Sequence, residues 1–162
     1  MVIKCWTDGA ATMKKNEDGE YLRSSGGSSA IFVGEDNKEI LTLQKGFEIA
    51  TNNYCELYAI SMAIGTFLCE FNDDDKLIIC SDSAYCVNML KAGGWVYGWK
   101  KNGWVRGKNK PIENLEIIKE IYCNLNDRIS FEKVKGHTGK DDWNNKADIL
   151  AVEAKRRAEK RL

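Results

Sequence analysis

Four acidic residues lie in four separate segments of the sequence, and carboxylates in such positions could form a metal site. Asp8 and Asp82 follow short apolar runs that are typical of strands. Glu56 and Asp148 lie beside the apolar stripe of predicted helices. Carboxylates that fold close together repel one another unless a cation lies between them. Because hard divalent ions such as Mg²⁺ take oxygen ligands, the pattern predicts a metal site held by acids alone.

Each of these acids also has a simpler explanation when it is taken alone. The pair Asp8-Gly9 is common in turns, and Glu56 in a first helical turn is favoured by the helix dipole. Asp82 before Ser83 could cap a helix, and Asp148 could face water. Only the combination of all four favours a functional site over these local roles.

The hydrophobic pattern predicts the elements that position the acids. Strands are expected at 2–7, 28–33, 39–47, 76–80 and 129–134, and helices at 53–71, 83–91, 95–104, from Pro111 onward and at 143–161. The polar stretch 10–27 is expected to be a long loop or an extended hairpin. This order predicts an α/β fold with a five-stranded mixed sheet, three antiparallel strands and then parallel strands, flanked by helices. Asp8 and Asp82 then lie side by side if the first and fourth strands are neighbours.

Composition indicates a soluble globular protein of one domain. The chain has 162 residues, of which 43% are hydrophobic and 30% charged, and its formal net charge is zero. The charges are unevenly distributed, since Lys91 to Lys110 holds six basic residues and no acid. A local basic patch of this kind matters more for contact with nucleic acid than the total charge does.

The cysteines indicate a reducing compartment rather than a zinc site. None of the six forms a C-x-x-C pair. Because no signal peptide precedes them, reduced thiols in the cytoplasm are the simplest interpretation. No apolar stretch approaches the ~20 residues that a membrane-spanning helix needs, so no membrane contact is expected, and a monomer is the default expectation.

Five motifs follow one another along nearly the whole chain. They are Thr7-Asp8-Gly9, Thr51-Asn52-Asn53 with Glu56-Leu57, Ser81-Asp82-Ser83, Val134-Lys135-Gly136-His137, and Asn144 with Asp148-x-Leu150-Ala151. Their order resembles that of ribonuclease H, type 1. The segment from Trp95 to Trp104 resembles the basic handle of that family. The resemblance therefore implies a single ribonuclease H domain over residues 1–162, with a basic handle at about 95–110.

The resemblance implies an endonuclease that hydrolyses the RNA strand of RNA–DNA hybrids and leaves 3′-hydroxyl and 5′-phosphate ends. It also implies two Mg²⁺ ions in the active site, with Mn²⁺ as an alternative. By analogy with the family, Asp8 contacts both ions, Glu56 and Asp82 hold the ion on the leaving-group side, and Asp148 holds the ion beside the attacking water. Two cations roughly 4 Å apart can activate water and stabilise the leaving oxygen.

His137 is the only histidine in the chain, and it lies between glycines in a predicted loop. Taken alone it is best explained as an exposed residue without a role. In the family motif this position has an accessory catalytic part in proton transfer or product release, which suits a group that titrates near neutral pH.

Contacts with the hybrid are implied at the start of the helix that carries Glu56. By resemblance, Asn52 and Asn53 lie in the minor groove, Thr51 meets a DNA phosphate, and Asn114 shares that phosphate pocket. Helix capping is the alternative role for Thr51 to Asn53, and both roles can hold at once.

The handle offers a second contact with nucleic acid. Aromatic residues alternate there with cations, a combination that suits sugar stacking and phosphate attraction; the residues are Trp95, Trp99, Lys100, Lys101 and Trp104. The alternative is a helix whose tryptophans belong to the core and whose lysines are solvated.

The sequence departs from the family pattern in two places that concern substrate contacts. The stretch after Gly9 is longer and more charged than the usual Gly-rich loop, and Ile49 stands where a basic residue is common. The competing interpretations are another nuclease of the same fold such as a junction resolvase, a hybrid-binding module without catalysis, and a domain of a larger polymerase. The four acids argue against a pure binding module, because clustered negative charge repels phosphates.

Overall fold

The computed structural model describes residues 1–12, 14–22, 24–136 and 142–159. The strands are β1 (Val2–Ala11), β2 (Lys14–Lys15), β3 (Tyr21–Leu22), β4 (Ser24–Val33), β5 (Glu39–Ala50), β6 (Lys76–Ser81) and β7 (Ile129–Lys133). The helices are α1 (Asn52–Glu70), α2 (Ala84–Leu90), α3 (Trp95–Lys101), the 3₁₀ helix η1 (Gly107–Asn109), α4 (Leu115–Asn124) and α5 (Trp143–Glu159).

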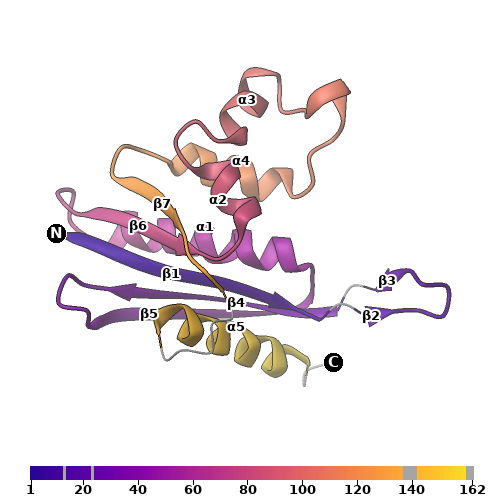
Figure 1. The fold of residues 1–162 in the computed structure, drawn as a ribbon, viewed down its shortest axis with the longest axis horizontal. Helices are drawn as coiled ribbons and strands as arrows, with labels where there is room; N and C mark the ends of the chain where they lie inside the picture. The colour runs from indigo at the N-terminus through magenta and orange to yellow at the C-terminus, as the bar shows by residue number, and fades with distance from the viewer. Residues whose placement is uncertain (13, 23, 137–141, 160–162) are drawn as a thin grey trace.

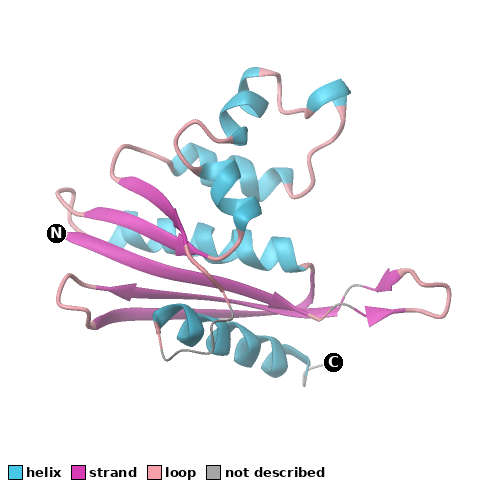
Figure 2. Ribbon diagram, viewed as in Figure 1, coloured by secondary structure: helices cyan, strands magenta, loops and turns pink. Residues whose placement is uncertain are grey.

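The main sheet is mixed, as the sequence predicts. Its strand order is β5-β4-β1-β6-β7. The pairs β4–β5 and β1–β4 are antiparallel, whereas β1–β6 and β6–β7 are parallel. Figures 1 and 2 show α1 and α5 on opposite faces of this sheet, with α2, α3 and α4 on the side of α1. The first and fourth predicted strands are therefore neighbours, which is the arrangement that places Asp8 beside Asp82.

Each face of the sheet is covered by apolar side chains. The larger core lies between the sheet and α1, α2 and α4, and its most buried side chains include Phe32, Leu57, Ile60, Phe67 and Ile79. A smaller cluster of Ile31, Val33 and Ala147 packs under α5. Ile31 and Phe32 are neighbours that point to opposite faces, as strand alternation requires. Each fully buried side chain of this size contributes about 1.5–3 kcal/mol, so both helices are firmly attached to the sheet.

Helix α1 occupies Asn52–Glu70, one residue earlier at each end than the predicted 53–71. It starts at Asn52 because the Thr51 hydroxyl accepts a hydrogen bond from the Tyr54 amide at 3.2 Å and caps the helix. The sequence suggested that Glu56 lies in the first turn of this helix. Because the helix starts at Asn52, Glu56 instead follows the first turn. None of the helices in the described parts of the chain is long and apolar enough to cross a membrane.

Strand β1 is longer than predicted, so Asp8 lies within it and not at its end. Pairing with β4 continues from Lys4 to Ala11, with Asp8 opposite Ser29 and Ala10 opposite Gly27. The small residues of both strands allow this continuation although the apolar pattern stops at Thr7. The stretch 10–27, predicted as a loop or an extended hairpin, is only partly so: its ends belong to β1 and β4 of the main sheet. Between them, β2 and β3 form a hairpin that projects beyond the end of the main sheet (Figure 1).

Two predicted helices are shorter than expected. Helix α3 ends at Lys101 because Gly103 and Trp104 adopt positive φ angles of 79° and 67°. Pro111 does not lie in the first turn of the next helix, since α4 begins at Leu115 after Asn114, whose φ of 59° is left-handed. Asparagine tolerates this conformation better than most residues.

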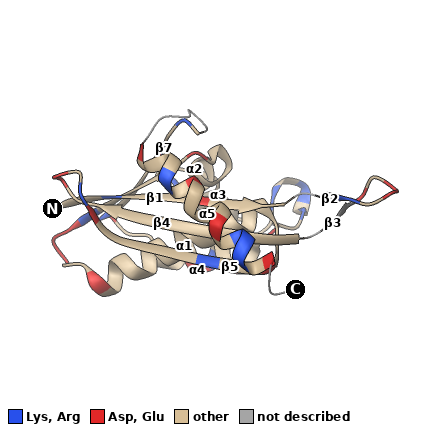
Figure 3. Cartoon of the chain, turned by 90° about the horizontal axis from the view of Figure 1, so that it is seen from below, with Lys and Arg blue, Asp and Glu red and all other residues tan. Residues whose placement is uncertain are grey.

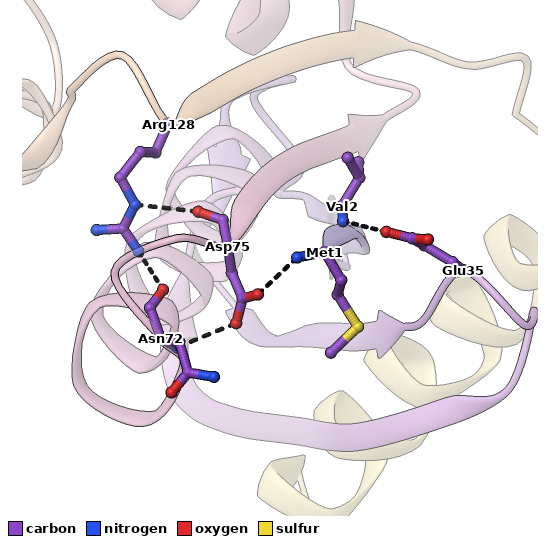
Figure 4. A network of polar contacts seen from close by, with 6 residues as sticks. All are labelled: Met1, Val2, Glu35, Asn72, Asp75 and Arg128. Atoms are coloured by element: carbon purple, nitrogen blue, oxygen red, sulfur yellow. Dashed lines mark hydrogen bonds and ion pairs between the residues drawn. The ribbon is translucent and has the colours of Figure 1, made fainter.

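A polar network joins the ends of the parallel strands that lie away from the acids (Figure 4). The Met1 amine donates to Asp75 Oδ1 at 2.9 Å. Arg128 donates from Nε to the Asp75 carbonyl at 3.0 Å and from Nη2 to the Asn72 carbonyl at 2.8 Å. Its guanidinium also lies over the Phe67 ring, 4.8 Å from the centroid. These contacts connect the starts of β1, β6 and β7. They therefore fix the positions of the three strands relative to one another, including at their opposite ends.

Candidate active site

Three carboxylates converge where β6 ends beside β1. A carboxylate oxygen from each of Asp8, Glu56 and Asp82 lies within 4.8 Å of the other two. Asp8 belongs to β1, Glu56 to α1, and Asp82 follows β6. Asp148 of α5 lines the same cavity, which has a volume of about 580 Å³. The structure therefore brings together all four acids that the sequence singled out.

The register of two parallel strands places the aspartates level with each other. In β1 and β6, Trp6 is paired with Cys80. Two residues further along each strand direction stand Asp8 and Asp82, so the two carboxylates emerge side by side at the same edge. The sequence indicated both residues, and the register explains why they meet.

Two glycines allow the carboxylate-bearing segments to approach. A Cβ on Gly9 would lie 2.3 Å from the Glu56 backbone nitrogen, so only glycine lets β1 touch α1 there. A Cβ on Gly136 would lie 2.4 Å from Asp82 Oδ2, so the segment after β7 rests directly against this acid. Sequence reasoning missed both roles, although a glycine directly after Asp8 is a signal of close backbone approach.

Burial and mutual repulsion make the cluster costly in its charged form. Burial first, and then the charges of Glu56 and Asp82, raise the pKa of Asp8 to about 10. Burial and the charge of Asp82 raise the pKa of Glu56 to about 8. Within the described part of the chain, Glu56 Oε2 is buried without a hydrogen-bond partner. A donor set of carboxylate oxygens with an unsatisfied buried oxygen fits a hard divalent cation such as Mg²⁺ or Mn²⁺.

The predicted hybrid-contacting residues lie around the start of α1. Asn52 lines the cavity that holds the acids, while Thr51 and Asn53 are exposed beside it. Thr51 and Asn114 line a second cavity of about 230 Å³ together with Ile49. Thr51 and Asn114 therefore lie close together, as a shared pocket would require, and Ile49 contributes an apolar side chain to the same cavity.

Some handle residues are exposed and available for contact with nucleic acid, whereas others belong to the core. Lys100 and Lys101 are exposed at the end of α3. Trp95 is 46% exposed, whereas Trp99 and Trp104 pack against the main core. Basic residues gather in the segment after α3, and acidic residues mark the tip of the β2–β3 hairpin (Figure 3). None of the handle residues lines the cavity of the acids, and His137 lies outside the described residues.

The fold and the site define an α/β protein with a carboxylate cluster suited to divalent cations, and comparison with known proteins identifies its family. The sequence matches the RNase H family over residues 2–156. It is 33% identical over 151 residues to a ribonuclease H of Chlorobaculum parvum, with 92% of each chain covered. It is 35% identical over 154 residues to a ribonuclease H of Prosthecochloris aestuarii, with 94% of each covered. The chain belongs to the ribonuclease H family.

Solved structures agree on the fold. LC9-RNase H1, described as a type 1 RNase H with the type 2 active-site motif, superposes with a TM-score of 0.76 at 23% identity, covering 97% of this chain and 73% of that one. LC11-RNase H1, solved in complex with an RNA/DNA hybrid, gives a TM-score of 0.65 at 19% identity, covering 96% of this chain and 98% of that one. The ribonuclease H-like sheet predicted from the sequence is thereby confirmed.

The raised pKa values predict how pH affects the stability of the metal-free protein. The folded state keeps protons on Asp8 up to about pH 10 and on Glu56 up to about pH 8, whereas their usual values are 3.8 and 4.5. The folded state thus binds more protons across this window, so stability is highest below it and falls as pH rises. We expect the Tm in chelator to fall between pH 5 and pH 8, and Asp8→Asn to raise the Tm at pH 8 and flatten this slope.

The matched control is Asp73→Asn, which removes an exposed acid from the turn before β6. A free-energy change of 1 kcal/mol shifts the Tm of a protein of this size by roughly 2–4 °C, so differential scanning calorimetry resolves the difference. If Asp8→Asn leaves the slope unchanged relative to the control, burial and the neighbouring charges do not raise the pKa of Asp8 as described.

Proposed function

We propose that this protein is an endonuclease that hydrolyses the RNA strand of RNA–DNA hybrids, leaving 3′-hydroxyl and 5′-phosphate ends. The observation that carries the proposal is the convergence of Asp8, Glu56 and Asp82, with Asp148 in the same cavity, in a chain of the ribonuclease H family. The curated relatives that are covered almost completely are themselves named ribonuclease H, which supports the same activity.

The acids would hold two divalent cations, Mg²⁺ or Mn²⁺. Such a pair of ions activates a water molecule and stabilises the leaving oxygen of a phosphodiester. We assign Asp8 to the position between the two ions, Glu56 and Asp82 to the leaving-group side, and Asp148 to the side of the attacking water. The position of Asp8 within 4.8 Å of both Glu56 and Asp82, in a cavity that Asp148 also lines, supports this assignment.

The start of α1 is the proposed point of hybrid recognition. Asn52 and Asn53 would read the minor groove, where the 2′-hydroxyls distinguish RNA from DNA. The cavity between Thr51 and Asn114 would take a phosphate of the DNA strand. Support comes from the exposure of Thr51 and Asn53 and from the position of Asn52 at the rim of the acid cavity.

The remaining assignments are proposals of the same kind. We assign His137 an accessory role in proton transfer or product release. We take residues 1–162 as one ribonuclease H domain with a basic handle at about 95–110, acting as a monomer. A cytoplasmic location is supported by the six cysteines, which are all free thiols in the structure.

A cleavage assay tests the proposed activity. End-labelled RNA–DNA hybrid, double-stranded RNA, single-stranded RNA, duplex DNA and branched duplex DNA are each incubated with Mg²⁺ or with a chelator. We expect cleavage of the hybrid alone, and only with Mg²⁺. Asp82→Asn should lower the rate of hybrid cleavage by more than the roughly 10–100-fold that removal of an outer-shell partner costs, because Asp82 belongs to the carboxylate cluster itself.

The other outcomes separate the competing functions. Binding of the hybrid without cleavage would identify a binding module, and cleavage of branched duplex DNA alone would identify a resolvase. Cleavage that persists in chelator would contradict a mechanism that depends on cations.

The handle proposal concerns affinity and its dependence on salt. Reversing Lys100 and Lys101 to glutamate should weaken hybrid binding and reduce the slope of log K against log [salt], since each lost phosphate contact removes about 0.9 from the slope. The measurement is fluorescence anisotropy over a salt series in the Asp82→Asn background. Lys38→Glu, an exposed change in the turn before β5, serves as the control. An unaltered slope would exclude the handle from the interface.

A further inference from the structure

Two adjacent serines of β4 are hydrogen-bonded to the two helices that carry acids of the site. Ser28 and Ser29 are both wholly buried, each 0% exposed. Ser28 Oγ donates to the Cys55 carbonyl at 2.7 Å, and Ser29 Oγ donates to the Ala147 carbonyl at 2.5 Å. Cys55 directly precedes Glu56, and Ala147 directly precedes Asp148. Each serine therefore holds the peptide group beside one acid of the site.

The two hydrogen bonds lie on opposite faces of the sheet. Successive residues of a strand point to opposite sides, so Ser28 meets α1 on one face while Ser29 meets α5 on the other. The preceding residues are glycines that allow the same contacts. A Cβ on Gly26 would lie 2.4 Å from Cys55 Sγ, and a Cβ on Gly27 would lie 2.1 Å from the Ala151 carbonyl oxygen. Both helices thus approach β4 closely along residues 26–29.

The same segment is paired with the strand that carries Asp8. Ser29 is opposite Asp8 and Ser28 is opposite Gly9 in the antiparallel register of β4 and β1. Through this pairing, residues 26–29 connect the strand of Asp8 with the helices of Glu56 and Asp148. Residues 26–29 are therefore in contact with the elements that carry all three acids.

We propose that Ser28 and Ser29 are positioning residues that hold Glu56 and Asp148 at the separation from Asp8 that the cations require. The inference rests on the proposed function, because it concerns the same site. Mg²⁺ demands near-ideal octahedral geometry at 2.0–2.1 Å from its ligands. A small shift of either helix against β4 would therefore matter more for ion binding than for packing, which many apolar contacts maintain.

This role differs in its consequences from an ordinary buried hydrogen bond. Removing a serine hydroxyl leaves the helix carbonyl free to keep its bond within the helix, so the loss of stability should be modest. The effect should appear instead in the affinity for the cation and in kcat at limiting Mg²⁺, with the KM for the hybrid unchanged. A purely structural role would lower the Tm in chelator without changing the affinity for Mg²⁺.

The test compares Ser28→Ala and Ser29→Ala with Ser25→Ala. Ser25 is a matched control on the same strand, because it is 1% exposed and its Oγ has no hydrogen-bond partner among the residues that the structure describes. Isothermal titration calorimetry with Mg²⁺ alone measures ion affinity without substrate, and calorimetry in chelator measures stability. We expect each of the two changes to weaken Mg²⁺ affinity by about 10-fold or more, the loss typical of outer-shell partners, and Ser25→Ala to leave it unchanged.

Cysteine substitutions keep the inference testable if an alanine variant does not fold. Ser28→Cys and Ser29→Cys nearly keep the volume of the side chain and offer a weaker donor, so a smaller loss of Mg²⁺ affinity is expected. Affinities equal to that of Ser25→Ala would overturn the positioning role. Failure of the wild-type protein to cleave any hybrid would instead overturn the proposed function, and the two failures are distinguished by assaying the wild type first.

Discussion

The repulsion among buried carboxylates is the constraint on which the rest of the structure depends. Asp8, Glu56 and Asp82 lie within 4.8 Å of one another in a largely buried position. Burial first, and then the charges of the neighbouring acids, raise the pKa of Asp8 to about 10 and that of Glu56 to about 8. The remainder of the protein must hold these groups together against their own charge, and a divalent cation turns the unfavourable cluster into a set of ligands.

The fold meets this constraint from both ends of the parallel strands. At one end, Arg128 and Asp75 connect the starts of β1, β6 and β7. At the other end, the register of β1 and β6 places Asp8 beside Asp82. Between them, the segment 26–29 of β4 contacts α1 and α5 through glycines that permit approach and serines that donate hydrogen bonds. Apolar burial stabilises the layers, while these polar contacts determine where the acids stand.

Features that depend on periodicity and residue type could be predicted from the sequence. The extent of an element could not be predicted where contacts with distant segments or local backbone conformation determine it. The apolar stripe of α1 and the mixed sheet were predictable, and so was the convergence of the four acids. The extent of β1 was not, because strand pairing between Asp8 and Ser29 continues through small residues that carry no apolar pattern. The predicted start of α4 was also wrong. Pro111 suggested the first turn, but the helix begins only at Leu115, after Asn114 in its left-handed conformation. The roles of Gly9, Ser28 and Ser29 arise from contacts between distant segments, which one sequence does not reveal.

The most direct measurement of the central claim is the location of bound cations. Crystals grown with Mn²⁺ at neutral pH give anomalous difference peaks at each bound ion. The account predicts peaks in contact with Asp8, with oxygens of Glu56 and Asp82 around one ion and of Asp148 around the other, at about 2.0–2.2 Å, near the spacing typical of Mg²⁺. Carboxylates that remain in place with no peak between them, or ions bound elsewhere on the surface, would contradict it.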